Sequence, residues 1–322
     1  MLTAGAIITL ERGHYRLREQ IAGSAYGLLW RASAAHGFGD VALKLVNEPQ
    51  MALAMPRQRA RWAASAANEI AFLQSLQPWD ERHIVRLLDS GRHQGLPVLA
   101  LELLDGDLGK HVAALHGAGR SVPLARLLDW IGQLNQALAK VHQYGWRYLD
   151  LKPANVLLDA RHNTVKLADF GTNRAAAAGE AHTYTGTASW QAPEQFFPQA
   201  GGTAYATGIR SDYFALGALF YFVAAGGVPL RFCSACGQAY REHHTGGAAM
   251  LLRRGGGAMP ATLEAAEEAL FARRIALAGG DAGAALALLR ALLAAAPAAR
   301  PANALQISRM LAQVRAGPQV PA

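Results

Sequence analysis

Short apolar runs separated by turn-forming residues dominate the first third of the chain. The runs with the length and composition of β-strands are 26–32, 41–46, 84–88 and 98–104. Glycines at 37–39 and 91–95 mark turns between them. The stretch 57–76 differs, because its apolar residues recur at helical spacing. This part of the chain therefore predicts a small sheet with one main helix.

From residue 124 onward the apolar residues recur at helical spacing, and alanine is abundant, which suits helices. The segments expected to be helical are 124–144, 212–225, 262–277, 282–296 and 302–315. The glycine-rich stretch 246–260 predicts a mobile loop. The uncharged run 213–230 only just reaches the length of a membrane span and contains glycine and proline near its end. We interpret this run as a buried helix.

The composition is typical of a folded protein from a reducing compartment. Of the 322 residues, 52% are hydrophobic and 17% are charged, which excludes a disordered chain and suggests two compact units. The 2 cysteines exclude a disulfide scaffold. The first ten residues carry no positive charge ahead of their apolar run, so we expect no secretory signal. The net charge of +8 favours acidic or phosphorylated partners but does not by itself indicate nucleic acid.

The stretches 148–155 and 165–171 carry the candidate chemistry. Phosphoryl transfer needs a carboxylate at the attacking hydroxyl, oxygen ligands for Mg²⁺, and a cation on the transferred phosphate. The residues suited to these tasks are, in that order, Asp150, Asn155 with Asp169, and Lys152.

These stretches resemble the catalytic core of eukaryotic-type (Hanks-type) Ser/Thr protein kinases, and the alanine- and arginine-rich composition resembles that of bacterial members. Further pieces follow in the family's order and spacing. They are Val-Ala-Leu-Lys at 41–44, Asp-Phe-Gly at 169–171, Gly-Thr at 186–187, Ala-Pro-Glu at 192–194, Asp212, and Arg300 as the partner of Glu194. Each piece alone is weak, but their joint order is specific. The resemblance extends from about residue 15 to residue 313.

The resemblance implies an α+β class and a bilobal protein-kinase-like fold. A small N-lobe, 15–104, would hold an antiparallel sheet with one main helix. A larger, mainly helical C-lobe would span 105–316, with a Cys/His and Gly-rich insert at 231–260. An N-terminal extension, 1–14, and a tail, 317–322, would flank the two lobes.

The resemblance also implies individual roles. Asp150 would accept the proton of the substrate hydroxyl, and Thr187 would dock the substrate. Lys44, held by Glu69 on the following helix, would position the nucleotide, and Asn155 and Asp169 would hold Mg²⁺. The other residues expected around ATP are Ile21, Gly27, Leu29, Ala42, Glu102, Leu104, Asp107 and Leu157.

Two departures from the family pattern affect these expectations. Ala22 and Ser24 replace the first two glycines of the phosphate loop, so that only Gly27 remains in register, and nucleotide affinity or rate could fall. Leu149 replaces the arginine that pairs with a phosphorylated activation loop, so we expect no requirement for loop phosphorylation through this contact. The hydroxyls at 183–185 are either sites of self-modification or ordinary solvated groups.

A cysteine pair lies outside this scheme. Cys233 and Cys236 are followed by His243 and His244, and together these residues could bind Zn²⁺ through nitrogen and sulfur. Two free thiols and a redox pair are the alternatives.

We therefore predict an ATP- and Mg²⁺-dependent protein serine/threonine kinase acting on proteins, including itself, in a bacterial cytoplasm. A secreted effector remains an alternative location. A pseudokinase scaffold is the main alternative function, and a small-molecule kinase is the third, disfavoured by Thr187 and by the Ala-Pro-Glu motif. We expect neither nucleic acid nor a membrane as partner. The sequence does not indicate the substrate, the upstream signal or the oligomeric state.

Overall fold

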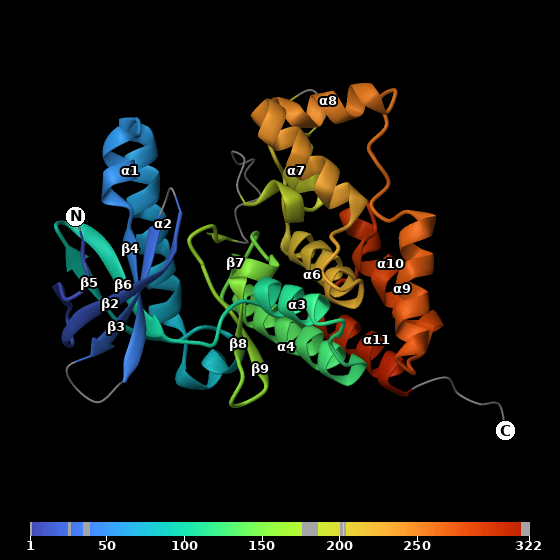
Figure 1. Ribbon diagram of the computed structural model, residues 1–322. Helices are drawn as coiled ribbons and strands as arrows, with labels where there is room; N and C mark the ends of the chain where they lie inside the picture. The colour runs from blue at the N-terminus through green and yellow to red at the C-terminus, as the bar shows by residue number, and fades with distance from the viewer. Residues whose placement is uncertain are drawn as a thin grey trace. The chain divides into compact units, whose positions relative to one another are not determined.

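The computed structural model describes residues 2–24, 27–34, 39–175, 186–199, 202 and 204–316. The chain folds into two units (Figure 1). The first comprises Met1–Asp105 with Ala168–Thr172, and the second comprises Gly106–Leu167 with Asn173–Ala322. Tyr26, the glycine at 37, the hydroxyls at 183–185 and the tail 317–322 lie outside the described residues.

The first unit is built on a six-stranded antiparallel sheet with the order β1-β2-β3-β4-β6-β5. Its strands are β1 (Ile7–Thr9), β2 (His14–Gly23), β3 (Gly27–Ala34), β4 (Asp40–Val46), β5 (Leu87–His93) and β6 (Leu96–Glu102). Its helices are α1 (Glu48–Leu53) and α2 (Pro56–Ser75), followed by a short 3₁₀ helix at Pro78–His83. The small sheet and the main helix α2 follow the predicted class, whereas β1, β2 and α1 were not expected as separate elements.

Side-chain alternation gives the central strands two distinct faces. On β4, Leu43 and Leu45 point into a buried apolar cluster that also includes Trp30 and Tyr15. Because alternate residues of a strand face opposite sides, Lys44 lies on the other face. The sheet therefore separates an apolar core from the surface that carries the candidate chemistry.

The N-terminal strand is attached to the far end of the sheet. The Glu11 N–H donates to the Ser90 carbonyl at 3.2 Å. The Tyr15 hydroxyl donates to the buried carboxylate of Asp89 at 3.0 Å. Burial, together with the nearby Asp89 charge, raises the pKa of this tyrosine. The residues before the expected N-lobe thus complete its core.

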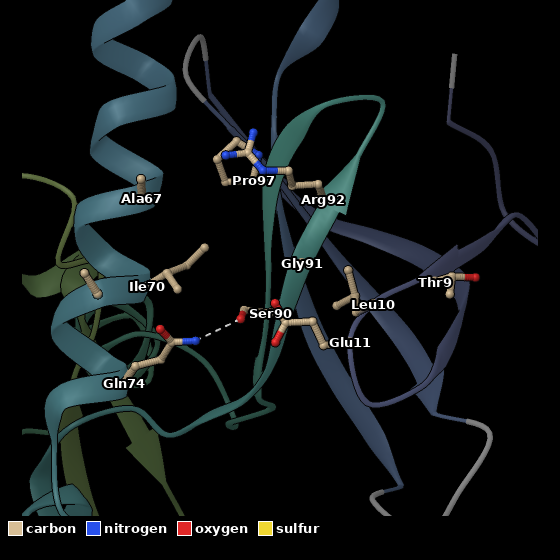
Figure 2. A pocket seen from close by; sticks show the side chains of 11 residues that line it. Thr9, Leu10, Glu11, Ala67, Ile70, Gln74, Ser90, Gly91, Arg92 and Pro97 are labelled. Carbon is tan, nitrogen blue, oxygen red and sulfur yellow. Dashed lines mark hydrogen bonds between the residues drawn. The ribbon is translucent and has the colours of Figure 1, made fainter.

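A groove of about 540 Å³ lies between α2, the β5–β6 hairpin and the residues around β1. Figure 2 shows Gln74 reaching from α2 to Ser90, whose hydroxyl accepts its hydrogen bond at 3.1 Å. None of the residues predicted to bind nucleotide lines this groove.

The second unit is mainly helical. Its helices are α3 (Leu108–Gly117), α4 (Leu124–Gln143), α5 (Pro193–Phe196), α6 (Ile209–Ala224), α7 (Arg231–His243), α8 (Gly247–Arg254), α9 (Ala265–Leu277), α10 (Ala282–Leu292) and α11 (Ala304–Ala316). Its short strands are β7 (Trp146–Arg147), β8 (Val156–Asp159), β9 (Thr164–Leu167) and β10 (Arg174–Ala175). Helix α6 is buried along most of its length and packs against α4, α9 and α10 (Figure 1).

Two sequence expectations about this unit have a structural outcome. Part of the expected loop 246–260 is helix α8, so the prediction of a loop over that stretch was wrong. The glycine there serves close packing, because a Cβ at Gly247 would lie 2.7 Å from the Ala239 carbonyl. The apolar run beginning at Tyr213 belongs to the buried helix α6, as predicted. Among the helices in the described part of the chain, none has the length and apolarity needed to cross a bilayer.

Candidate active site

The lysine predicted to position a nucleotide lies between two carboxylates of the first unit. The Lys44 Nζ is 2.6 Å from Glu69 Oε2 and 2.8 Å from Asp169 Oδ1. Glu69 is buried on α2, whereas the Asp169 side chain is 44% exposed. Burial alone would lower the pKa of Lys44, but the charges of Asp169 and Glu69 outweigh it and raise that pKa. The lysine is therefore a fixed cation, which suits a phosphate-bearing ligand.

Helix α2 is also bonded directly to the segment 169–171. The Ser65 hydroxyl donates to the Gly171 carbonyl at 2.8 Å. The Phe170 N–H donates to Glu69 Oε1 at 3.2 Å. The sequence does not single out Ser65, because a lone helical serine carries no pattern. These bonds couple the position of α2 to the backbone beside Asp169.

Ring stacking and a rare backbone conformation define the same segment. The rings of Phe72 and Phe170 stack with centroids 4.6 Å apart. Asp169 has a φ of 61°, in the left-handed region, which is uncommon for residues other than glycine, although Asp adopts it more often than most. Such conformations concentrate at functional sites, which agrees with the role expected of Asp169.

Two of the residues predicted to bind nucleotide, Leu29 and Ala42, lie on the face of the sheet that carries Lys44. Leu29 pairs with Lys44 across β3 and β4, and Ala42 lies two residues before Lys44 on the same strand. Cross-strand partners and alternate residues share a face, so these three side chains do too. The other residues lie at strand ends or on β2: Ile21 on β2, Gly27 at the start of β3, Glu102 at the end of β6 and Leu104 just after it.

Ser24, just after β2, and Gly27, at the start of β3, are hydrogen-bonded to each other. The Ser24 N–H donates to the Gly27 carbonyl at 2.8 Å, and the Gly27 N–H donates to Ser24 Oγ at 3.1 Å. The Asn47 side chain donates to the Ser24 carbonyl at 2.7 Å. Ser24, which replaces a glycine of the family pattern, therefore supplies a hydroxyl oxygen that accepts the Gly27 N–H. In glycine-rich loops, backbone N–H groups of this kind bind phosphates.

In the second unit, three polar side chains converge on the buried Asp150. The Thr187 hydroxyl donates to Asp150 Oδ1 at 2.7 Å. The Lys152 Nζ lies 2.8 Å from Asp150 Oδ2 and 2.8 Å from the Thr187 hydroxyl oxygen. The Asn155 amide donates to the carbonyl and to Oδ2 of Asp150, at 2.9 and 3.1 Å. Residues that the sequence spreads over 150–187 therefore form one hydrogen-bonded cluster.

The loop that carries Asp150 takes its shape from buried side chains around it. Asp212, in the first turn of α6, accepts the N–H groups of Tyr148 and Leu149 at 2.9 and 2.7 Å. The His142 Nε2 lies 2.9 Å from Asp212 Oδ2. The Gln195 amide donates to the Leu149 carbonyl at 3.0 Å, and Leu149 has a φ of 65°. The sequence indicates Asp212 but neither His142 nor Gln195, because a single imidazole or amide carries no pattern.

A close backbone approach and a buried ion pair lie on either side of Thr187 in the sequence. Gly186 has a φ of 93°, and a Cβ there would lie 2.6 Å from the Leu149 carbonyl oxygen, so only glycine fits. The predicted pair of Glu194 and Arg300 is present. The Arg300 guanidinium is fully buried and donates to both carboxylate oxygens, at 2.7 and 2.8 Å. Such bidentate pairs fix geometry as well as charge.

Asp107 and Leu157, both predicted near the nucleotide, form an isolated antiparallel bridge. Asp107 is the N-cap of α3, and its carboxylate accepts the Lys110 N–H at 2.9 Å. Leu157 lies on β8 and is partly buried. The carboxylate of Asp107 therefore has a structural task in addition to the place predicted for it near ATP.

The side chains of Asn155 and Asp169 have the chemistry that Mg²⁺ prefers. Both hydrogen bonds donated by the Asn155 amide go to Asp150, so its side-chain oxygen is the atom that can act as a ligand. Asp169 supplies a partly exposed carboxylate. Mg²⁺ usually takes one or two protein oxygens together with substrate phosphates and water. Each of the two side chains therefore offers an oxygen of the kind that this ion binds.

The structure does not support the zinc site expected at Cys233, Cys236, His243 and His244. Both cysteines are fully buried on α7, and burial raises the pKa of Cys233 to about 12, whereas zinc binds the thiolate. The seven residues from Cys236 to His243 correspond to about 10 Å along a helix, too far for one ion. Within the described ranges, no three His, Cys, Asp or Glu side chains are grouped to hold a metal.

Comparisons with known proteins agree with this arrangement. The protein kinase domain family model matches residues 15–311. Cyclin-dependent kinase B2-2 of Arabidopsis thaliana is 31% identical over 63% of this chain and 62% of that protein. CBL-interacting protein kinase 22 of Oryza sativa subsp. japonica is 30% identical over 68% of this chain and 50% of that protein. This chain thus spans between half and two thirds of these relatives.

A solved structure supports the fold. The crystal structure of a mutant form of the Mycobacterium tuberculosis PknI kinase domain matches with a TM-score of 0.60 and 24% identity. The match covers 98% of this chain and 99% of that one. With the family model covering most of its length, the chain belongs to the protein kinase domain family.

Proposed function

We propose that this protein is a eukaryotic-type serine/threonine kinase that transfers the γ-phosphoryl group of ATP to protein hydroxyls, its own included. The observation that carries the proposal is the cluster at Asp150. The Asp150 carboxylate accepts a hydrogen bond from the Thr187 hydroxyl at 2.7 Å and also contacts the Lys152 ammonium. It therefore binds an O–H group next to a cation. Protein phosphorylation requires that combination.

Each residue then has a defined task. Asp150 orients the substrate hydroxyl and accepts its proton as the oxygen attacks, and Lys152 offsets the negative charge that develops on the transferring group. Lys44, fixed by Glu69, positions the nucleotide phosphates. Asn155 and Asp169 would hold Mg²⁺, which supplies charge neutralisation on the phosphates when bound. The pseudokinase alternative gains no support, because these side chains are all present with the bonds that orient them.

The protein substrate and the bacterial, cytoplasmic setting remain parts of this proposal. Lys152 and Thr187 support serine and threonine over tyrosine as acceptors, because they match the pattern of serine/threonine kinases. Phosphoamino-acid analysis of a phosphorylated generic protein such as casein tests this point. Phosphotyrosine as the main product would contradict it.

The decisive experiment measures transfer from labelled ATP with Mg²⁺ to casein and to the protein itself. Asp150→Asn should lower the rate by roughly 10²–10⁴-fold, the usual contribution of a general base. Asp129→Asn is the matched control, because Asp129 forms only a half-exposed ion pair with Arg315 on the surface. Lys44→Met should also abolish transfer, with Lys140→Met in the last turn of α4 as its control. Full activity of Asp150→Asn, or no transfer by the wild type, would refute the proposal.

A further inference from the structure

Arg147 is a buried arginine next to the catalytic loop. It ends β7, directly before Tyr148, and is only 3% exposed. Burying a guanidinium is costly unless its N–H groups are bonded. Burial lowers the pKa of Arg147, while the charge of Asp212 acts in the opposite direction, and an arginine remains charged throughout the usual pH range. A charge kept at such a cost points to a specific task.

The guanidinium of Arg147 joins three segments of the second unit. Its Nη1 donates to the Thr207 carbonyl at 2.5 Å and to the Thr207 hydroxyl at 3.1 Å. Its Nη2 donates to the Ala175 carbonyl at 2.7 Å. Ala175 lies on β10, which pairs with β7 and follows Gly171 closely in the chain, and Thr207 lies two residues before α6. One side chain therefore bonds β7, which leads into the loop that carries Asp150, to β10, which follows the segment 169–171.

The position at which the resemblance places a phosphate-dependent anchor holds no arginine. Leu149 stands where the resemblance places an arginine, and it is 3% exposed with its N–H bonded to Asp212. The acceptors of Arg147, in contrast, are two backbone carbonyls and one hydroxyl. These groups are present whatever the phosphorylation state of the chain.

We propose that Arg147 is a positioning residue that anchors β10, the start of the connection from Gly171 to Thr187, against the catalytic loop without the need for a phosphate. The inference rests on the proposed kinase function. It adds to that function an anchor that does not depend on phosphorylation. The anchor is Arg147, two residues before Leu149, where the resemblance places an arginine.

The test compares Arg147→Met, Arg147→Lys and Arg174→Met with the wild type. All proteins are treated with a phosphatase and checked by mass spectrometry before assay. Arg174 is the matched control, because it is paired with Arg147 across β7 and β10 but its Nη1 donates to the adjacent Asn173 carbonyl. Two readouts are taken: kcat and KM for casein and ATP, and hydrogen exchange of the peptides that contain 174–175 and 207.

We expect the dephosphorylated wild type to be active. Arg147→Met should lower kcat by about 10²-fold, as misplaced reacting groups do, with KM for ATP changed by less than about threefold. Arg147→Lys should recover part of kcat, and exchange should rise at 174–175 in Arg147→Met alone. Arg174→Met should keep kcat and exchange close to those of the wild type.

Several results would overturn the anchor: loss of wild-type activity on dephosphorylation, wild-type kcat in Arg147→Met, or an equal loss in Arg174→Met. If Arg147→Met does not fold, Arg147→Lys decides, because full activity of that variant would show that the guanidinium is not needed. If the wild type transfers no phosphoryl group, the proposed function fails. The exchange data then decide the anchor alone, and unchanged protection at 174–175 in Arg147→Met would refute it.

Discussion

Gly171→Ala is expected to damage the first unit in a way that a second substitution repairs. A Cβ at Gly171 would lie 2.3 Å from Ser65 Oγ, whereas ordinary contact begins at 3.4 Å, so the hydroxyl would have to move by about 1 Å. The Ser65 Cβ and carbonyl oxygen are both 3.5 Å from that position. Ser65→Ala therefore removes the clash and leaves ordinary contact.

The expected energies follow from these distances. Overpacking in a packed site costs about 1–3 kcal/mol, and the Ser65–Gly171 hydrogen bond contributes about 0.5–1.5 kcal/mol. Gly171→Ala loses both terms, whereas Ser65→Ala and the double variant lose only the hydrogen bond. The two sites should thus show a coupling energy of about 1.5–4.5 kcal/mol, the sum of the two terms, equivalent to about 10–2,000-fold in the equilibrium constant of unfolding.

The assay is urea unfolding combined with phosphoryl transfer for the four proteins of the cycle. Gly132→Ala, in the middle of α4, is the control for the intrinsic effect of alanine. Its nearest contact is a flexible arginine atom at 3.6 Å, so a change between zero and about 1 kcal/mol of stabilisation is expected. If the double variant is as unstable and as slow as Gly171→Ala, the Ser65 hydroxyl is not the obstacle and the reasoning is wrong.

Three further predictions concern the second unit. Arg300→Met should lower the free energy of unfolding by about 3–5 kcal/mol, because it leaves the Glu194 carboxylate without its cation in a mostly buried site. The loss of stability in the double variant Arg300→Met, Glu194→Gln should be smaller than the sum of the losses in the two single variants. A loss below about 1 kcal/mol in Arg300→Met would contradict the importance of the pair. Cys233 and Cys236 should react slowly with iodoacetamide at pH 8 in the folded protein and rapidly in urea, because burial raises the pKa of Cys233 to about 12 and so disfavours its thiolate. Rapid labelling of the native protein, or stoichiometric zinc in untagged protein, would contradict this prediction. Asp107→Ala should destabilise by about 1 kcal/mol through loss of the α3 cap, whereas Asp107→Asn should be neutral in the same unfolding measurement; equal stability of the two variants would contradict the capping role.

The hydrogen-bonded cluster at Asp150 was predictable from sequence because most of its residues lie close together in the chain. Asp150, Lys152 and Asn155 fall within six positions, and the structure brings all three together. The pairing of Lys44 with Glu69 was predicted from the resemblance to the kinase family, and the structure contains it. The helices α4, α6, α9, α10 and α11 were predicted because their apolar residues recur at helical spacing, whereas α3 and α7 were not expected as helices.

Features that depend on packing between distant segments could not be predicted. The side chains of Ser65, Gln195 and Arg147 donate hydrogen bonds to backbone carbonyls of distant residues. Because every residue has a backbone carbonyl, the sequence does not indicate which one is the partner. The strand β1 is only three residues long, and β2 is exposed at every residue beyond Leu17, so neither produces a long alternating pattern. The zinc hypothesis failed because Cys-x-x-Cys resembles a metal knuckle only when it lies in a turn, and here it lies in a helix buried against other elements.

The contacts around α6 also set an order of events during synthesis. Asp212 bonds residues 63 and 64 positions before it, and Arg300 bonds a carboxylate 106 positions before it. On the ribosome the loop that carries Asp150 emerges long before these partners, and contacts of such separation form late. A nascent chain that has not yet reached residue 300 therefore holds all of the proposed catalytic side chains but lacks one of the contacts that fix their geometry. The proposed catalytic side chains are therefore expected to reach their final geometry only after residue 300 has been synthesised.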